Sequence, residues 1–271
     1  MPEGHTIHRL ARDHGTWFAG DRVHVSSPQG RFGDGAALVD GAQLEATDAY
    51  GKHLFHRYAG GHTVHVHLGL FGRFLTHGSP PPEPRDTVRY RVLGGERTVD
   101  LVGATACELL DPDEVDAIIA RLGPDPIRKD ADPDRAWGAL QRRRIAIGRA
   151  LMDQSVIAGI GNVYRAEVLF VHGIHPELPA NQLSRPQWDA IWTTLVSWLR
   201  RGVREQRIVT VDPEEVGKPR SRMTREEATY VYRSETCLRC DSEVRRWDLA
   251  GRWAYACETC QPRPRHRAGA R

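Results

Sequence analysis

Lysine is scarce in this sequence, and long hydrophobic runs are missing. Of the 38 basic residues only three are lysines, Lys52, Lys129 and Lys218. Each of them is of interest, because a lysine can lose its proton and an arginine effectively cannot. No apolar run is long enough to span a bilayer, and the N-terminus lacks the basic patch and hydrophobic stretch of a secretory signal. We therefore expect a cytoplasmic protein with no membrane partner.

A large excess of one charge is also missing, since the net charge is only +3. So mild an excess does not by itself require a polyanionic partner. The arginines are nevertheless clustered in residues 141–144, 199–207 and 262–271. Such clusters are typical of a solvated surface and also of a nucleic-acid-binding surface, and both interpretations stay open here. We expect residues 262–271 to be a disordered basic tail.

The length of 271 residues and the hydrophobic content of 40% suit a globular protein with two domains. Near the N-terminus Ile7, Leu10 and Ala11 share one face at helical spacing. This pattern predicts a short helix from about residue 4, and Gly15 is its predicted end.

From about residue 17 to residue 110 the sequence consists of short β-like runs separated by glycine-rich turns. Residues 62–72 alternate most clearly, with His65 and His67 on one face. The opposite, apolar face carries Val64, Val66, Leu68 and Leu70. The prolines of residues 79–85 predict a loop, because consecutive prolines cannot join a sheet ladder. Residues 1–123 are therefore predicted to form a β-sandwich that carries an N-terminal helix.

The second half of the chain is predicted to be helical. A helix capped by Asp111 or Asp113 precedes a polar, proline-bearing connector over residues 124–133. Residues 134–232 follow as a helical domain, in which one long helix is expected to end at Gly202. Its predicted core face consists of Trp188, Ile191, Trp192, Leu195, Trp198 and Leu199. The fold class is thus α+β with several domains.

Four of the five cysteines form two close pairs near the C-terminus, Cys237 with Cys240 and Cys257 with Cys260. Two residues between paired cysteines let both thiolates reach one tetrahedral ion, and the interval between the pairs suits a β-hairpin. We predict one structural Zn²⁺ in a finger over residues 233–261. The fifth, Cys107, is predicted to be a buried strand residue.

Residues 156–170 combine two glycines with an asparagine, Asn162, just before a helical run. Glycines let a backbone approach a ligand closely, and a helix start offers unpaired N–H groups to an anion. Asn162 could cap this helix or donate its side-chain amide to a phosphate. The pattern alone leaves both roles open.

The chain begins Met-Pro-Glu-Gly. Removal of Met1 is expected before a residue as small as Pro2, and it would leave Pro2 as a free secondary amine. Such an amine is a nucleophile, since an α-amino group titrates near pH 8 and keeps a useful neutral fraction at physiological pH.

Four separated features now coincide: the Pro-Glu-Gly terminus, Lys52 within GKHL, Asn162 within GIGN, and the terminal four-cysteine motif. Together they closely resemble the formamidopyrimidine-DNA glycosylase and endonuclease VIII family of base-excision repair enzymes. The resemblance extends from Pro2 to Gln261. It implies an N-terminal β-sandwich, a helix–two-turns–helix DNA-binding domain and a C-terminal zinc finger.

The resemblance also implies catalytic roles. Pro2 would attack C1′ of a damaged nucleotide, and the iminium formed would favour β-elimination and then δ-elimination. Glu3 stands at the general-acid position. Lys52 matches a lysine near the phosphate of the lesion, and Arg252 matches a finger arginine that grips phosphates and assists the second elimination. The partner would be double-stranded DNA with oxidised bases or abasic sites, bound by a monomer.

Further residues match DNA-contacting positions. Asn162 and His67 would face the phosphate backbone, while Leu70 and Phe71 would fill the space left by a flipped base. Arg121 falls where endonuclease VIII relatives have a DNA-contacting arginine, and an ion pair at the domain junction is the alternative. Two positions depart from the family pattern: Gly69 stands where endonuclease VIII commonly has glutamine, and His5 stands where an acidic residue or proline is usual. Glu167 lies in a matching helix and has no assigned role.

The terminal Pro-Glu-Gly favours the endonuclease VIII branch, whose members excise oxidised pyrimidines such as thymine glycol and dihydrouracil. Members of the branch that excises oxidised purines usually begin with Pro-Glu-Leu. The His-Leu-Gly of residues 67–69, however, resembles the purine branch. An oxidised-purine glycosylase is therefore the first alternative, and a non-catalytic, zinc-containing protein that binds damaged DNA is the second. Loss of catalysis would be expected to show as loss of Pro2, Glu3 or Lys52, and all three are present.

Overall fold

The computed structural model describes residues 2–264, and the chain divides into two compact units, Met1–Leu122 and Gly123–Arg271. Each unit has its own hydrophobic core. Met1 and most of the predicted basic tail, residues 265–271, lie outside the described residues.

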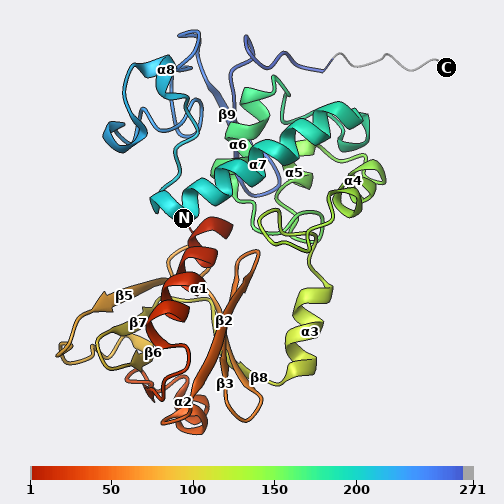
Figure 1. The fold of residues 1–271 in the computed structure, drawn as a ribbon. Coiled ribbons are helices and arrows are strands. Elements are labelled where there is room, and N and C mark those ends of the chain that lie inside the picture. Colours follow the sequence, from red (N-terminus) through yellow and green to blue (C-terminus); the bar gives the residue numbers. More distant parts are fainter. Residues whose placement is uncertain (1, 265–271) are drawn as a thin grey trace. The chain divides into compact units, whose positions relative to one another are not determined.

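The first unit is a β-sandwich with an N-terminal helix, as the sequence predicts (Figure 1). Its elements are α1 (Gly4–Phe18), β1 (His24–Ser26), α2 (Gly33–Val39), β2 (Leu44–Tyr50), β3 (His53–Tyr58), β4 (His62–His67), β5 (Arg73–His77), β6 (Val88–Leu93), β7 (Thr98–Val102), β8 (Ala106–Leu110) and α3 (Pro112–Ala120). One sheet has the strand order β1-β6-β7-β5 and the other has the order β2-β3-β4-β8. All pairings are antiparallel.

Alternating apolar residues of the two sheets form the core of this unit. Val64 and Val66 of β4 are fully buried there, together with Leu54 of β3 and Val92 and Val99 of the other sheet. Burial of each such side chain stabilises the fold by roughly 1.5–3 kcal/mol relative to exposure. The prediction that Cys107 is a buried strand residue is confirmed, because β8 holds it with 3% of its surface exposed.

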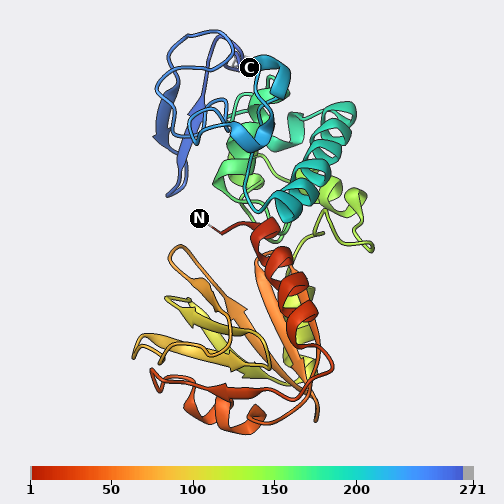
Figure 2. The ribbon, with the colours of Figure 1, turned by 60° about the vertical axis from the view of Figure 1, so that its left-hand side comes forward.

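Helix α1 lies along β2 and β3 (red beside orange in Figure 2) and is longer than predicted. It continues past Gly15 to Phe18, so the prediction that Gly15 ends it is wrong. The glycine serves packing instead: a Cβ at this position would lie 2.7 Å from Thr47 Oγ1 on β2. Phe18 is buried in the core, and its burial extends the helix by one turn.

Strand β4 is shorter than the predicted alternation. It ends at His67, and Leu68 is still buried, but Leu70 is 47% exposed and does not continue the apolar face. The chain turns after Leu68, where the Gly72 N–H donates to the Leu68 carbonyl over 3.0 Å. Leu70 and Phe71 therefore lie in the connection between β4 and β5.

The second unit is helical and ends in a β-hairpin. Its elements are α4 (Pro133–Gln141), α5 (Ile147–Ala150), α6 (Asn162–Val171), the short 3₁₀ helix η1 (Ala180–Gln182), α7 (Arg185–Glu205), α8 (Pro213–Val216), the 3₁₀ helix η2 (Arg220–Arg222), β9 (Arg245–Asp248) and β10 (Trp253–Ala256). Strands β9 and β10 pair antiparallel as a two-stranded sheet.

The long helix α7 (teal in Figure 1) packs the predicted apolar face against the core, with Trp188 fully buried and Trp192 partly buried. The predicted end at Gly202 is wrong. Gly202 is buried inside the helix, which runs to Glu205 and ends at Gln206 in a left-handed conformation, with the Gln206 N–H bonded to the Gly202 carbonyl. Gln206, rather than a glycine, is the left-handed residue that follows this helix, so the prediction from Gly202 placed the helix end one turn too early.

Two helices begin in a reciprocal capping box, and the first of these caps was predicted from the sequence. Asp111 caps α3, and its carboxylate accepts from the Glu114 N–H while the Glu114 carboxylate accepts from the Asp111 N–H. Ser184 and Gln187 form the same reciprocal box at the start of α7. Among the described residues, none of the helices combines the length and the apolar character needed to cross a membrane.

Candidate functional site

Three of the four predicted catalytic residues, Pro2, Glu3 and Lys52, lie at one end of the first unit. Helix α1 and strand β2 run antiparallel, because the Gly20 N–H after the helix donates to the Leu44 carbonyl at the start of the strand (2.8 Å). Further along, Thr47 Oγ1 donates to the Ala11 carbonyl over 2.5 Å. The residues before α1 and the turn after β2 consequently lie at the same end of the unit.

Pro2 and Glu3 directly precede α1, and Glu3 is its N-cap residue. The Glu3 carbonyl accepts from the Thr6 N–H at 2.9 Å, while its side chain makes no capping bond. Glu3 is fully buried, whereas Pro2 is partly exposed. A carboxylate at this position is stabilised by the positive end of the helix dipole.

Lys52 lies in the tight turn between β2 and β3. The turn depends on Gly51, whose φ of 58° is in the left-handed region that favours glycine. Tyr50 pairs with His53 across the turn, so the hairpin holds Lys52 at its tip. The side chain of Lys52 is partly exposed.

Three histidines and a glutamate form a chain on the outer face of the second sheet. His53 Nδ1 lies 2.8 Å from His65 Nε2, and His65 Nδ1 lies 2.9 Å from Glu108 Oε1. His67 stands opposite His53 in the strand register, with ring centroids 5.0 Å apart. The alternation of residues 62–67 predicted the shared face of His65 and His67. The part played by His53 and Glu108 depends on strand pairing and was missed.

Burial favours the neutral form of these imidazoles. It lowers the pKa of His53 to about 3, and the nearby charges of His65, His67, Arg121 and Lys52 lower that pKa further. The pKa of His67 is lowered by burial first and then by His65 and Lys52. The predicted residues His67, Lys52 and Arg121 therefore lie near enough to His53 to lower its pKa.

Arg121 is the C-cap residue of α3 and is exposed. Its N–H donates to the Ile118 carbonyl, so the helix end fixes the backbone of the arginine. The structure thus places Arg121 at the end of the unit that carries Lys52.

Leu70 and Phe71 are the large apolar side chains of the β4–β5 connection and are 47% and 81% exposed. The adjacent Gly69 has a φ of 66°, and a Cβ there would lie 1.9 Å from Thr105 Oγ1. A glutamine at this position would be strained at this φ and would have to displace the Thr105 side chain, so glycine fits this backbone.

In the second unit, Asn162 is the first residue of α6, and Gly161 is its N-cap. The Asn162 side chain does not cap the helix. Its Nδ2 donates to the Trp253 carbonyl over 3.1 Å, and its Oδ1 accepts from Arg165. The capping role considered from the sequence is therefore excluded, because the asparagine amide bonds the β9–β10 hairpin instead.

Arg252 immediately precedes β10, in the turn of that hairpin, and is exposed. Its Nη1 donates to the Gly251 carbonyl at 3.2 Å. The Leu249 N–H donates to the Arg252 carbonyl across the turn at 2.8 Å, so the backbone is held while the guanidinium points to solvent.

Glu167 of α6 is a fully buried carboxylate that sequence reasoning left without a role. Its Oε2 accepts from Thr210 Oγ1 and from the Tyr230 N–H, both at 2.6 Å, and its Oε1 accepts from the Val231 and Tyr232 N–H groups at 3.0 and 2.9 Å. Burial raises the pKa of Glu167, and these four donors act in the opposite direction. The carboxylate ties the segment around Tyr230 to the helix.

The four cysteines converge as predicted. Their Sγ atoms all lie within 4.8 Å of one another, and Cys237 to Cys260 and Cys240 to Cys257 are separated by 4.0 and 3.5 Å. Four thiolates about 2.3 Å from one tetrahedral Zn²⁺ would be about 3.8 Å apart. The cluster therefore fits a single zinc ion, with no position left for a substrate.

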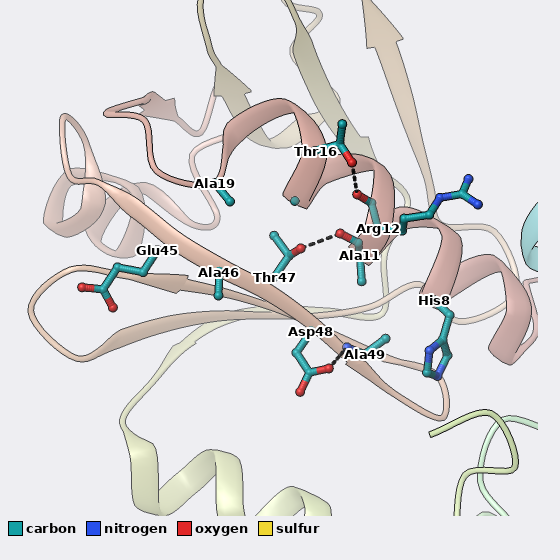
Figure 3. Close-up of a pocket in the computed structure, with 11 residues that line it drawn as sticks. His8, Ala11, Arg12, Thr16, Ala19, Glu45, Ala46, Thr47, Asp48 and Ala49 are labelled. Carbon is teal, nitrogen blue, oxygen red and sulfur yellow. Dashed lines mark hydrogen bonds between the residues drawn. The ribbon is translucent and has the colours of Figure 1, made fainter. Parts of the chain in front are cut away.

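A shallow hollow of about 480 Å³ lies between α1 and β2. Figure 3 shows His8 and Asp48 near one end and Ala19 and Glu45 near the other, with Thr47 on its floor. None of the predicted catalytic or DNA-contacting residues lines it. The candidate site is thus the end of the unit rather than this hollow.

Comparisons with known proteins agree with this geometry. Residues 1–102 match the formamidopyrimidine-DNA glycosylase N-terminal domain, and residues 122–212 match the H2TH domain of the same family. The chain is 49% identical over 267 residues to Endonuclease 8 1 of Mycobacterium tuberculosis, covering 96% of this chain and all of that protein.

The chain belongs to the formamidopyrimidine-DNA glycosylase and endonuclease VIII family. It is also 32% identical over 209 residues to a formamidopyrimidine-DNA glycosylase of Parafrankia, covering 73% of this chain and 70% of the relative. A crystal structure of the Lactococcus lactis glycosylase with abasic-site DNA has the same fold, with a TM-score of 0.77 at 20% identity, and covers 96% of this chain and all of that one.

Family membership confirms the fold predicted from the motifs. The helical region of the second unit is the helix–two-turns–helix domain, and the β9–β10 hairpin with the four cysteines on either side of it corresponds to the zinc finger. The protein is a DNA glycosylase of this family.

Proposed function

We propose that the protein is a bifunctional DNA glycosylase and abasic-site lyase that removes oxidised pyrimidines in base-excision repair. The observation that carries the proposal is the Pro2–Glu3 pair, with Glu3 buried at the head of α1 and Lys52 at the same end of the unit. The 49% identity to proteins called Endonuclease 8 1 supports the pyrimidine branch.

The reaction would begin at the N-terminal amine. After removal of Met1, the lone pair of the Pro2 nitrogen attacks C1′, and the glycosidic bond breaks as the N–H proton passes to the departing base. Glu3 then donates a proton to O4′, the C1′–O4′ bond breaks, and the opened sugar is left as an iminium on Pro2. The iminium then withdraws electrons as a proton leaves C2′, and the bond from C3′ to the 3′ phosphate oxygen breaks. A second elimination breaks the bond from C5′ to the 5′ phosphate oxygen, and water then hydrolyses the iminium, which releases the sugar remnant and frees Pro2.

Positive and hydrogen-bonding groups would hold the phosphates during these steps. We assign Lys52, His67 and Arg252 to this task, because Lys52 and Arg252 are presented by tight turns and His67 lies beside Lys52. Asn162 has one amide N–H on the Trp253 carbonyl, and its second N–H can donate to a phosphate. Arg121 would add a further contact near Lys52.

The remaining assignments concern the base pair and the metal. Leu70 and Phe71 would fill the gap that the flipped nucleotide leaves, since both are exposed apolar side chains in one connection. One Zn²⁺ bound by the four cysteines would brace the hairpin that carries Arg252. The protein would act as a monomer in the cytoplasm on double-stranded DNA.

Sodium borohydride tests the enzyme proposal, because it reduces the iminium and fixes the protein to its substrate. Duplexes containing thymine glycol, dihydrouracil, 8-oxoguanine or no lesion would be compared. We expect trapping by the two pyrimidine lesions first. Faster trapping by 8-oxoguanine would support the purine alternative, and binding without any trapping would support the non-catalytic alternative.

A matched pair of proteins tests the nucleophile. One form begins at Pro2 and the other keeps additional residues before it, so that the proline nitrogen is an amide. We expect the extended form to bind abasic DNA and to give no trapped complex. Equal strand cleavage by both forms would refute the role of Pro2.

A further inference from the structure

The hairpin of the second unit carries a large aromatic side chain beside Arg252. Trp253 is 50% exposed, although tryptophan is highly buried on average. Arg246 of β9 covers one face of the indole, with its guanidinium carbon 4.7 Å from the ring centroid. In the strand register Trp253 pairs with Asp248 and Tyr255 pairs with Arg246, so Trp253 and Arg246 are diagonal neighbours.

Hydrogen bonds also hold the backbone of Trp253 in place. Its carbonyl accepts from Asn162 Nδ2 at 3.1 Å and from Arg165 Nη2 at 2.7 Å. Arg165 is 1% exposed and also donates to the Gly148 carbonyl over 3.3 Å. Helix α6 thus anchors the first residue of β10, and Arg246 orients its side chain.

An aromatic ring fixed in this way has low conformational freedom to lose when a planar ligand stacks on it. A guanidinium on one ring face leaves the exposed part of the indole for a second flat group. The acidic residue opposite Trp253 in the strand register is already engaged, because Asp248 accepts from the Gly251 N–H. The surface of the hairpin therefore presents the Trp253 indole, stacked on the Arg246 guanidinium, beside the exposed Arg252.

We propose that the Arg246–Trp253 stack is a further DNA-contacting surface, which takes a nucleobase that has lost a stacking neighbour at the damaged site. The inference rests on the proposed function for damaged DNA as the partner and for Arg252 as a phosphate contact. Arg252 would hold the phosphate while Trp253 stacks on the base. Every base has a π face, so the contact would be tolerant of sequence.

Stacking and phosphate contacts differ in their response to salt. Neutralising a phosphate releases counterions and steepens the dependence of affinity on salt, whereas stacking does not. Truncation of a stacking aromatic side chain weakens binding by roughly 5-fold to 100-fold. Because the anchor to α6 uses the carbonyl of Trp253, replacing its side chain leaves that anchor intact.

The experiment measures binding of the full chain to a duplex with a tetrahydrofuran abasic analogue, over a series of salt concentrations. Trp253→Ala should weaken binding about tenfold and leave the salt slope unchanged. Trp253→Phe should recover most of the affinity. Arg252→Ala should weaken binding and lower the slope by about 1. Leu238→Ala removes another exposed apolar side chain of the finger and should have no effect.

A spectroscopic readout identifies the occupant. The fluorescent base 2-aminopurine is placed opposite, 5′ or 3′ to the abasic analogue, one position at a time. We expect quenching on binding at one position with the wild type and Trp253→Phe, and none with Trp253→Ala. Circular dichroism and thermal melting establish that each variant is folded.

Three results would overturn the inference: unchanged affinity in Trp253→Ala, an equal loss on undamaged duplex, or absence of quenching at all three positions. The proposed function fails differently, because wild-type protein would then give no borohydride-trapped complex. Trapping by Trp253→Ala at saturating DNA, with weaker binding, would support both.

Discussion

The buried carboxylate of Glu167 supports the sharpest stability prediction. We consider Glu167→Gln, which keeps the size of the side chain and removes one acceptor. Glutamine can place its carbonyl oxygen where Oε1 accepts from Val231 and Tyr232, so these two bonds can survive. Its NH₂ group then faces the Thr210 hydroxyl and the Tyr230 N–H, which donate to Oε2 in the wild type, and it cannot accept from them. The Thr210 hydroxyl can still donate to the Ala228 carbonyl (3.1 Å), but the Tyr230 N–H loses its acceptor.

The magnitude follows from this inventory. A buried donor left without an acceptor costs about 1–3 kcal/mol, and the two surviving bonds lose the strength that the charge gave them. Relief from burying a charge acts in the opposite direction. We expect the free energy of opening the segment around Tyr230 to fall by roughly 2–4 kcal/mol.

Hydrogen exchange is the suitable assay, since a chain of two compact units need not unfold in one step. The amides of Tyr230, Val231 and Tyr232 should lose protection by a factor of about 30 to 700, because 1.4 kcal/mol corresponds to tenfold. Glu235→Gln, at an exposed position of the same region, is the control and should change protection little. A loss below threefold in Glu167→Gln would refute the reasoning.

Three further predictions concern pH, catalysis and metal. Burial lowers the pKa of His56 to about 3 and that of His14 well below its usual value. Below pH 6.5 the unfolded chain therefore binds protons that the folded chain does not. Each imidazole should reduce the free energy of unfolding by about 1.4 kcal/mol at pH 5.5 relative to pH 7.5. Equal stability at the two values, measured by denaturant titration, would contradict this. Glu3→Gln should slow base removal at least 100-fold and cleavage of a pre-formed abasic site far less, and equal losses on the two substrates would argue against a general acid. Removing zinc with a chelator, or replacing Cys240 by Ser, should unfold the β9–β10 hairpin and reduce DNA affinity, as shown by metal analysis and binding assays; retention of both without metal would exclude a structural ion.

Local patterns predicted the elements well and their ends less well. The alternation before His67 and the apolar spacing of α7 both identified real elements. Gly15 and Gly202 misled because each lies inside a helix, and Gly15 is required there by a contact with Thr47 that no local pattern contains.

In the candidate site, too, the features set by local spacing were predicted and those set by long-range contacts were not. Spacing alone identified the four cysteines, because two residues between thiolates constrain geometry locally. The use of Asn162 could not be derived in this way, since its amide bonds a carbonyl 91 positions further along the chain. The His53–His65–Glu108 chain also depends on strand register.

The amino-acid sequence by itself determined the order of the domains, the four-thiolate cluster, the Pro2–Glu3 terminus and membership of the family. Those features are local, and backbone geometry carries them wherever the motif occurs. Only the tertiary structure decided that Glu167 braces the segment around Tyr230 and that Trp253 is an anchored, half-exposed platform. Such roles arise from donors and acceptors that are distant in the chain, and burial makes each unpartnered polar group costly enough to select one arrangement.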